Sequence, residues 1–338
     1  MLGRATSFAA QCRWGWEQGL AFRLPRSFQQ ARQLLMLGVG GSAIGAELLQ
    51  GIVGDRIRRP VVVNRTYTLP AWVDRKTLGI ICSYSGNTEE TLTAAQEAVR
   101  RGARVMAITS GGKLALWAGR DRFPVLLIPA GLPPRAAIGY QLFAPLGILV
   151  RMGWLNRRAV PAQEGWESVG RTIRQRLAPS IPTMENPAKQ IALRLKGKLP
   201  ILYGASGGWE GLAYRWRTQL EENAKTLAYH HLFPEATHNE ISGWLQPKEL
   251  MNRMVAIFLS DPAVHPRIRR RMTFTARIIG QQGAQVMTLG AGGRGRSALS
   301  RLLELVALGD FVSIYLGLLY RVDPTPVDRV EALKKWLR

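Results

Sequence analysis

The stretch of sequence that decides the fold is Cys82-Ser83-Tyr84-Ser85-Gly86-Asn87-Thr88-Glu89-Glu90-Thr91. It follows an apolar run, residues 77–81, that is typical of a buried strand, and it leads into a helical pattern that ends near Arg100. Three hydroxyl side chains and a glycine therefore lie in the turn between a strand and a helix. The N-terminus of a helix presents unpaired N–H groups and the positive end of its dipole. Such a turn is typical of a site for a small anion, usually phosphate.

An ordinary helix cap is the alternative interpretation of this turn. In that case Asn87 or Ser85 caps the helix, and Glu90 completes a capping box. A cap needs one hydroxyl or amide group, whereas the turn carries Ser83, Ser85 and Thr88 beside a flexible glycine. The composition of the turn therefore favours the interpretation as an anion site.

Strand and helix patterns alternate along the first half of the chain. Alternation with short loops predicts a parallel sheet covered by helices on both faces, with ligands at the carboxyl edge of its strands. The expected strands are residues 33–39, 61–64, 77–82, 104–108 and 124–128, and the expected helices are residues 42–52, 89–100 and 136–152.

A second round of the same pattern follows a polar, proline-containing stretch at residues 156–165. The glycine-rich loop 204–208 of this half matches the loop 38–42, because both follow an apolar strand and open a helix. We therefore expect an N-terminal helical segment (1–32) and two copies of one α/β unit (33–153 and 154–338), the second with a C-terminal helix. Its expected helices are 166–177, 187–195, 209–226, 264–279, 297–319 and 326–337, and its expected strands are 199–203, 227–232, 253–259 and 285–289.

From the sequence of 338 residues we expect a cytoplasmic protein that does not bind to a membrane. The N-terminus lacks a signal-peptide pattern, and no uninterrupted apolar run reaches the ~18 residues that a membrane span requires. Cys12 and Cys82 are too far apart in the sequence to form a metal-binding motif, and two cysteines make no disulfide framework. Since Cys82 ends an expected buried strand, we expect a reduced thiol in the core.

The net charge of +23 attracts anions over the whole surface and supports non-specific nucleic-acid binding. The densest cluster consists of Arg267 and residues 269–271, which lie on one expected helix without interleaved aromatic residues. No helix-turn-helix, zinc-finger or RNA-binding signature accompanies this cluster. We therefore expect no specific nucleic-acid partner.

The first glycine-rich loop differs from a dinucleotide-binding fingerprint. Gly38-Val39-Gly40-Gly41-Ser42-Ala43 does not follow G-x-G-x-x-G, and no acidic residue ends the next strand near Asn64. The loop therefore does not predict a redox cofactor.

Three of the four histidines, His230, His231 and His238, lie close together in the sequence. Adjacent residues of a strand point to opposite faces, and neither H-x-H nor H-x-x-x-H spacing is present, which argues against a metal site. His238 lies beyond Pro234 in a loop before a helix. An isolated histidine in such a loop is usually an ordinary surface residue.

Two adjacent glutamates lie near the end of the expected helix 209–226. Glu221 has Arg217 at i−4 and Lys225 at i+4, which is typical of an exposed charge ladder. Glu222 has threonines at those positions and lies in the last turns, where the helix dipole disfavours a negative charge. A carboxylate in such a place is a candidate general base, although the spacing alone still favours a solvated surface residue.

Seven segments that occur in this order carry a resemblance to a known family. They are residues 40–45 (Gly-Gly-Ser-Ala-Ile-Gly), 83–91, 108–112 (Ile-Thr-Ser-Gly-Gly), 133–135 (Pro-Pro-Arg), 222–225 (Glu-Asn-Ala-Lys), 238–240 (His-Asn-Glu) and 323–327 (Asp-Pro-Thr-Pro-Val). From about residue 33 to 338 the chain resembles the bifunctional phosphoglucose/phosphomannose isomerase family, built from two sugar isomerase (SIS) domains. The serine-rich segment alone implies only a SIS domain, which regulators and aminotransferases share. The glutamate and histidine segments narrow the resemblance to the isomerases.

The resemblance implies two α/β SIS domains, each a doubly wound parallel sheet flanked by helices. It also implies a cofactor-free aldose–ketose isomerase that interconverts glucose 6-phosphate, mannose 6-phosphate or both with fructose 6-phosphate, through a cis-enediolate. By this resemblance Arg135 stabilises the enediolate and Glu222 moves the proton between C1 and C2, although the neighbouring Glu221 is an alternative base. The residues implied to hold the substrate and its phosphate are Gly40, Gly41, Ser42, Ser83, Ser85 and Thr88.

The resemblance further implies a homodimer. His238 opens the sugar ring and is supplied by the second subunit, and Lys334 of the C-terminal helix assists ring opening, with the adjacent Lys335 as the alternative. Zinc-dependent phosphomannose isomerases use another fold, which nothing here resembles. A non-catalytic sugar-phosphate-binding SIS module would need the phosphate loop but not Glu222, His238 and Lys334. An amino-sugar phosphate isomerase is the second alternative, and the sequence does not rank glucose against mannose.

Overall fold

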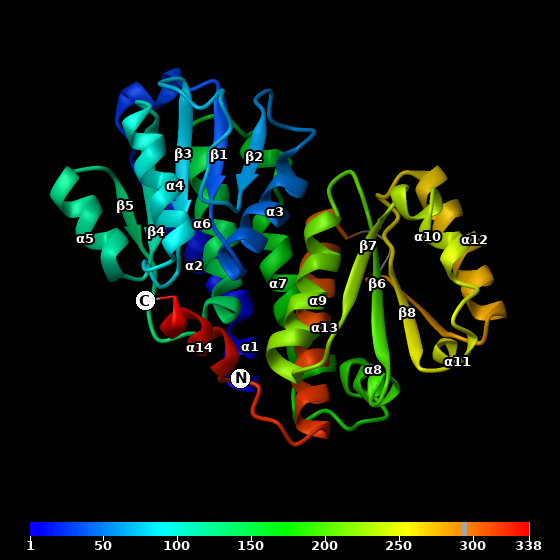
Figure 1. The fold of residues 1–338 in the computed structure, drawn as a ribbon. Helices are drawn as coiled ribbons and strands as arrows, with labels where there is room; N and C mark the ends of the chain where they lie inside the picture. The colour runs from blue at the N-terminus through cyan, green and yellow to red at the C-terminus, as the bar shows by residue number, and fades with distance from the viewer. Residues whose placement is uncertain (292–295, 338) are drawn as a thin grey trace. The chain divides into compact units, whose positions relative to one another are not determined.

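The computed structural model describes residues 1–291 and 296–337. The chain folds into two α/β units, and Figure 1 labels most of their helices and strands. The N-terminal unit consists of Ser7–Gly170 and Gly207–Gly211, and the C-terminal unit consists of Met1–Thr6, Arg171–Ser206 and Leu212–Arg338. The domain boundaries predicted after residues 32 and 153 stay predictions, since a compact unit need not coincide with a domain.

The N-terminal unit is built on a five-stranded sheet in the order β2-β1-β3-β4-β5, and every strand pair is parallel. In this order the chain leaves β1 toward one edge and then returns to place β3 on the other side. The chain therefore reverses its direction across the sheet between the neighbouring strands β1 and β3. Their carboxyl ends form the topological switch point, where doubly wound sheets bind their ligands. The strands are β1 (Gln33–Leu37), β2 (Val61–Asn64), β3 (Thr77–Cys82), β4 (Arg104–Thr109) and β5 (Val125–Leu127).

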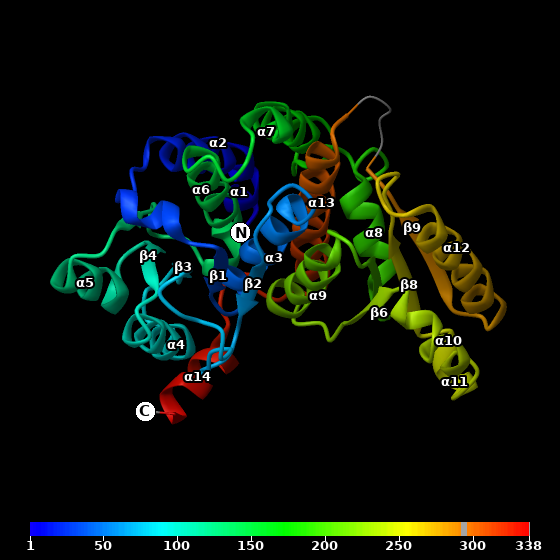
Figure 2. The ribbon, with the colours of Figure 1, turned by 90° about the horizontal axis from the view of Figure 1, so that it is seen from above.

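Helices cover both faces of this sheet (Figure 2). On one face, leucine and isoleucine side chains of β1 and β3 pack against Ala94, Ala95 and Ala98 of α4, whose small side chains allow a close approach. On the other face α3 packs on α6, and α6 packs on α2. The helices are α2 (Phe8–Ala21), α3 (Gly41–Val53), α4 (Glu89–Arg100), α5 (Gly112–Asp121), α6 (Ile138–Arg151) and α7 (Ala162–Thr172), with 3-10 turns η1 (Arg26–Gln30), η2 (Pro134–Ala137) and η3 (Arg157–Ala159).

The C-terminal unit repeats this topology with four parallel strands in the order β7-β6-β8-β9. Its first strand again lies inside the sheet, between its second and third strands, so the prediction of two similar α/β halves is confirmed. The strands are β6 (Leu199–Ala205), β7 (Tyr229–Phe233), β8 (Met254–Leu259) and β9 (Gln285–Leu289).

Two sets of helices flank the second sheet (Figure 1). Met272 and Ile279 of α12 pack with Tyr203 and Phe258 of the sheet in one apolar core. Trp244, directly after α10, and Met251 of α11 extend this core. On the other side α8, α9 and α13 pack together. The helices are α1 (Leu2–Thr6), α8 (Pro187–Leu195), α9 (Glu210–Ala224), α10 (Glu240–Gly243), α11 (Lys248–Met251), α12 (Pro266–Gln281), α13 (Ala298–Leu319) and α14 (Asp328–Trp336), with a π-helical turn η4 (Ile173–Leu177) and a 3-10 turn η5 (Glu235–Thr237).

Helix α13 is long and apolar enough to cross a membrane by length and composition, with a mean hydropathy of 1.9 in its best window. However, 83% of that window is buried inside the structure, as in the core helix of a water-soluble protein. This helix was predicted from the sequence, but no candidate membrane span was found here, because only uninterrupted apolar residues were counted and Glu304 and Asp310 interrupt the apolar sequence.

Most strands and helices begin and end within two residues of the predicted positions, and α5 is the main element that the sequence did not predict. Helix α5 begins after Gly111, which has no side chain to cap it. Instead, Asn87 Oδ1 and the Gly86 carbonyl accept hydrogen bonds from the N–H groups of Lys113 (3.0 Å) and Leu114 (2.9 Å). Because its cap comes from another loop, α5 has no local start signal.

Candidate active site

The serine-rich turn after β3 leaves the N-terminus of α4 open. Thr88 is the N-cap residue, and it makes no capping hydrogen bond through its side chain among the described residues. Asn87 is occupied with α5, and Ser85 Oγ accepts a hydrogen bond from Asn87 N at 3.3 Å. Neither side chain therefore caps α4, which argues against the helix-cap interpretation and leaves the first-turn N–H groups available for an anion.

Hydroxyl groups from two loops meet at the switch point between β1 and β3. Ser83 Oγ, which is buried, donates to Thr88 Oγ1 at 3.1 Å. Ser42 Oγ, in the first turn of α3 after β1, accepts a hydrogen bond from Tyr84 N at 3.3 Å. Both loops follow adjacent parallel strands, so their polar groups lie at the same edge of the sheet.

Glycines allow these loops to pack backbone against backbone. A Cβ atom on Gly41 would lie 3.2 Å from the Cα and N atoms of Arg135. Gly86 has a φ of +66°, and a Cβ atom there would lie 1.9 Å from the Gly111 carbonyl oxygen, so no other residue fits. The contact at Gly41 brings the buried Arg135 directly beside the first turn of α3.

Tyr84 is a structural residue of the site that sequence reasoning missed. Its hydroxyl donates to the Pro129 carbonyl at 2.8 Å and accepts from Leu132 N at 3.0 Å. It thereby fixes the segment that leads to Arg135. The signal was present in the sequence, because a buried aromatic residue inside a turn of small polar residues needs a packing partner and a hydrogen-bond partner.

Glu222 lies on α9, which a buried polar network attaches to α13. Arg215 and Gln219 both bind the carboxylate of Asp310, at 2.7 and 3.0 Å. Asn223 Nδ2, directly after Glu222, donates to Ser313 Oγ at 2.9 Å. Glu222 is half-buried at the edge of this face, so its backbone position is fixed by its neighbours.

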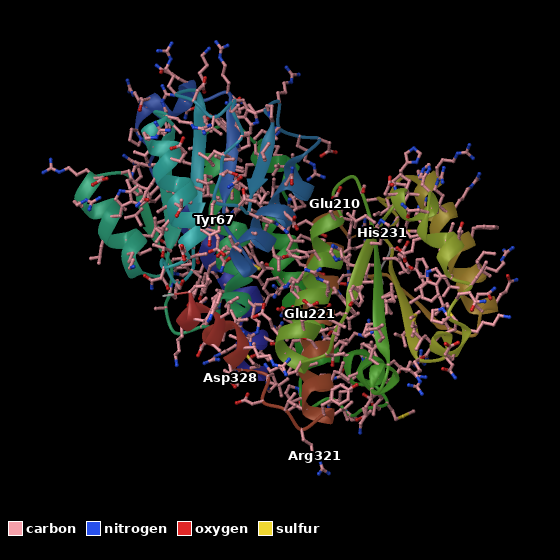
Figure 3. The ribbon with its side chains drawn as sticks, in the orientation of Figure 1. Tyr67, Glu210, Glu221, His231, Arg321 and Asp328 are labelled. Atoms are coloured by element: carbon pink, nitrogen blue, oxygen red, sulfur yellow. The ribbon has the colours of Figure 1, made fainter. Side chains whose placement is uncertain are left out.

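The predicted charge ladder at Glu221 exists only in part. Arg217 Nε lies 3.7 Å from Glu221 Oε2. Lys225 has a φ of +55° and ends the helix, and its Nζ donates to the carbonyls of Glu222 and Pro326, each at 2.5 Å. Burial raises the pKa of Glu221, Arg217 opposes that shift, and the charge of Glu222 adds to it. Glu221, labelled on α9 in Figure 3, is therefore half-buried rather than exposed.

The two adjacent histidines of β7 point to opposite faces of the sheet, as predicted. The ring of His230 lies 5.4 Å from that of Tyr214 on α9. Nδ1 of His231, labelled in Figure 3, contacts the carboxylate of Glu240 on α10. His238 follows η5 and is exposed. Lys334 and Lys335 are exposed residues of α14.

After two strands of the second sheet, β6 and β8, carboxylates of the chain itself bind in the corresponding loops. Glu210, which opens α9 after the loop 204–208, accepts hydrogen bonds from Gly207 N (2.7 Å) and Gly208 N (2.9 Å). After β8, the buried Asp261 is bound by Arg301 at 2.6 and 2.9 Å and caps Ala263 N at 2.8 Å. Among the described residues, the loops after β6 and β8 therefore have internal carboxylate partners, whereas α4, after β3, has no side-chain cap.

The predicted residues fall into two groups. The N-terminal unit brings together Arg135 and the loop residues Gly40, Gly41, Ser42, Ser83, Ser85 and Thr88. Glu222, His238 and Lys334 belong to the C-terminal unit. A cavity of about 330 Å³ lined by residues of α2, η3 and α7, among them Trp16 and Trp166, contains none of these residues. That cavity is therefore separate from the candidate site.

Comparison with known proteins gives matches along most of the chain. Residues 27–117 match the model of the SIS domain, and residues 184–337 match that of the bacterial phospho-glucose isomerase C-terminal SIS domain. The chain is 44% identical over 308 residues to a bifunctional phosphoglucose/phosphomannose isomerase of Caldicellulosiruptor bescii, covering 90% of this chain and 89% of the relative. It is 35% identical over 306 residues to a protein of the same name from Aquifex aeolicus, covering 90% of each.

A similar fold occurs in the C-terminal domain of glucosamine-fructose-6-phosphate aminotransferase from Francisella tularensis. The TM-score is 0.74 at 14% sequence identity, and the match covers 96% of each chain. At this identity the match supports the fold alone, and it agrees with the predicted pair of SIS domains.

Proposed function

The chain belongs to the bifunctional phosphoglucose/phosphomannose isomerase family and is a sugar phosphate isomerase, and on this basis we propose that it interconverts glucose 6-phosphate and mannose 6-phosphate with fructose 6-phosphate. One observation carries the proposal. The switch point of the first sheet has two helix N-termini, those of α3 and α4, without side-chain caps among the described residues, and hydroxyl groups lie beside them. This is the arrangement that binds a phosphate group.

In the proposed mechanism the 6-phosphate is held by the loops after β1 and β3. Ser85 and Thr88 donate hydrogen bonds to the phosphate, Ser83 donates to Thr88 Oγ1 and so orients the Thr88 hydroxyl, and the N–H groups of α4 add the field of the helix dipole. Gly40, Gly41 and Ser42 contact the substrate, and the absence of a side chain at Gly41 lets the backbone of Arg135 lie beside them. The positive charge of Arg135 then stabilises the oxyanion of the enediolate.

Proton transfer is assigned to Glu222. Aldose–ketose isomerisation moves one proton between C1 and C2 and leaves the net oxidation state unchanged, so the reaction needs a base and no redox cofactor. Glu222 is half-buried on a helix that the Arg215–Asp310 pair holds in place. A base with a fixed backbone position keeps its carboxylate near the reacting carbon.

Ring opening is assigned to His238, with assistance from Lys334 or the adjacent Lys335. We propose that His238 enters the active site of the partner subunit, so the active form is a homodimer. His238 is exposed and lies after a turn rather than in the core, as a residue that acts across an interface must. The proposed compartment is the cytoplasm.

The decisive experiment measures fructose 6-phosphate formation from glucose 6-phosphate and, separately, from mannose 6-phosphate, with and without EDTA. The proposal predicts turnover of both substrates and no effect of EDTA. Binding of both sugar phosphates without turnover would instead support a non-catalytic SIS module. Turnover confined to glucosamine 6-phosphate would support an amino-sugar phosphate isomerase.

A further inference from the structure

A cluster of polar side chains lies beside the segment that carries His238, and the mechanism above does not use it. Both carboxylate oxygens of Glu240, the first residue of α10, are bound by side chains of neighbouring strands. Oε1 accepts a hydrogen bond from the Tyr203 hydroxyl of β6, and Oε2 contacts His231 Nδ1 of β7. Tyr203 and His231 are register partners in the sheet, so the two strands present both groups at the same level.

Tyr203 is itself held rigidly. Its ring stacks on Phe258 with a centroid distance of 4.7 Å and an interplanar angle of 21°. Its hydroxyl accepts a hydrogen bond from Trp244 Nε1 at 2.8 Å. Burial and the adjacent Glu240 carboxylate raise the pKa of Tyr203 far above its usual value, so the hydroxyl keeps its proton and remains a donor.

The chain on the other side of His238 is also tethered. Thr237 Oγ1 accepts a hydrogen bond from Arg271 Nη1 at 2.6 Å and donates to the Pro234 carbonyl at 2.7 Å. Glu240 lies two residues after His238, and Thr237 lies one residue before it. An exposed imidazole is therefore carried by a short segment whose two ends are attached to β6, β7 and α12.

We infer that Glu240, held by Tyr203 and His231, is a positioning residue that sets His238 for opening the sugar ring. The inference rests on the proposed function of His238. The competing explanation is that the cluster merely satisfies buried polar groups of the C-terminal unit. The two explanations differ in which chemical step suffers when the cluster is broken.

Ring opening and proton transfer can be separated by the choice of substrate. Glucose 6-phosphate is cyclic and needs ring opening before proton transfer at C2. In contrast, 5-deoxyfructose 6-phosphate lacks the hydroxyl group that closes the furanose ring, and the phosphate blocks closure through O6. This compound is therefore open and requires only the base. Loss of a group that positions His238 should slow the first reaction and spare the second.

The test compares Glu240→Gln and Tyr203→Phe with wild type, with His238→Ala as the reference and with Glu235→Gln as the matched control. Glu235 is an exposed glutamate of the same segment. For Glu240→Gln and Tyr203→Phe we expect kcat with glucose 6-phosphate to fall about tenfold or more, as a misplaced catalytic group implies. The rate at which the C1 hydrogen of 5-deoxyfructose 6-phosphate exchanges in D₂O, measured by NMR, should stay within about twofold of the wild-type rate. Glu235→Gln should change neither rate.

Equal losses with both substrates, or no loss with either, would overturn the inference. Thermal unfolding of each variant identifies a folding defect, and if Glu240→Gln fails to fold, Tyr203→Phe decides, because it keeps the stacked ring. If wild type makes no fructose 6-phosphate, the proposed function is wrong. If His238→Ala keeps full activity with glucose 6-phosphate, the role assigned to His238 is wrong. In both of these cases the inference about Glu240 is rejected as well.

Discussion

Replacing Thr88 by valine is the sharpest test of the phosphate site. Valine keeps the branched shape of threonine and removes only the hydroxyl group. In the structure Thr88 Oγ1 accepts a hydrogen bond from Ser83 Oγ at 3.1 Å, which leaves the Thr88 proton free to donate to an anion. The substitution should therefore remove one hydrogen bond to the 6-phosphate without opening a cavity.

The expected magnitude follows from the charge of the acceptor. A hydrogen bond to a charged group contributes about 1.5–3 kcal/mol. At about 1.4 kcal/mol per factor of ten, KM should rise about ten- to hundredfold. Since the phosphate is held equally in the ground state and the transition state, kcat should change little. In Thr88→Val the Ser83 hydroxyl also loses its hydrogen-bond acceptor, which should lower the free energy of unfolding by about 1 kcal/mol.

The chain offers a matched control one turn further along α4. Thr91 Oγ1 is buried and has no hydrogen-bond partner among the described residues. Thr91→Val makes the same chemical change in the same helix, but it removes an unsatisfied polar group. We expect an unchanged KM and a free energy of unfolding higher by about 1 kcal/mol, measured by urea denaturation.

The assay is steady-state isomerase kinetics with glucose 6-phosphate, combined with the inhibition constant of inorganic phosphate. In Thr88→Val both KM and the inhibition constant should rise by a similar factor. A KM within about twofold of wild type, when unfolding shows an intact fold, would refute the reasoning and return the turn to a purely structural role.

Three further predictions concern the base, the assembly and the cysteines. Glu222→Gln should lower kcat by at least about a hundredfold with substrate still bound, whereas Glu221→Gln should keep most activity; the opposite result would make Glu221 the base. Glu222→Gln mixed with His238→Ala should regain activity, because each heterodimer then has one intact site, or about a quarter of all sites in a random mixture. No recovery, once mass spectrometry has confirmed subunit exchange, would place both residues in the site of one subunit. Burial raises the pKa of Cys82 to about 12 and that of Cys12 well above its usual value, so iodoacetamide at pH 8 should label neither thiol until the protein is unfolded.

The sequence predicted those parts of the structure that depend on local patterns. The apolar strand before Ser83 and the turn chemistry after it are contiguous in the chain, so they were sufficient to predict the loop at the sheet edge. Helix α5 was not predictable in the same way, because its cap is Asn87, which precedes it by 25 or more residues. Pairing between distant segments is decided by tertiary packing and leaves no signal at the helix start.

In the candidate site, too, contacts between distant segments could not be predicted from the sequence. Glu221 was distinguished from Glu222 in the sequence by the residues at i−4 and i+4. The observed position of the Lys225 side chain, however, depends on the turn that ends α9 and on the carbonyl of Pro326. The cluster at Glu240 depends on the register that places Tyr203 opposite His231. Register between strands that are far apart in sequence cannot be read from hydrophobic alternation alone.

The carboxylates of Glu210 and Asp261 act as ligands that the chain carries with it. A tethered group is present at a high effective concentration, so a free phosphate at cellular levels competes poorly for the same N–H groups. In the proposed function, the turn after β3 therefore binds the phosphate, and the loops after β6 and β8 do not. The second sheet then contributes to the proposed mechanism through residues that lie elsewhere on its unit, Glu222 on α9 and His238 after η5.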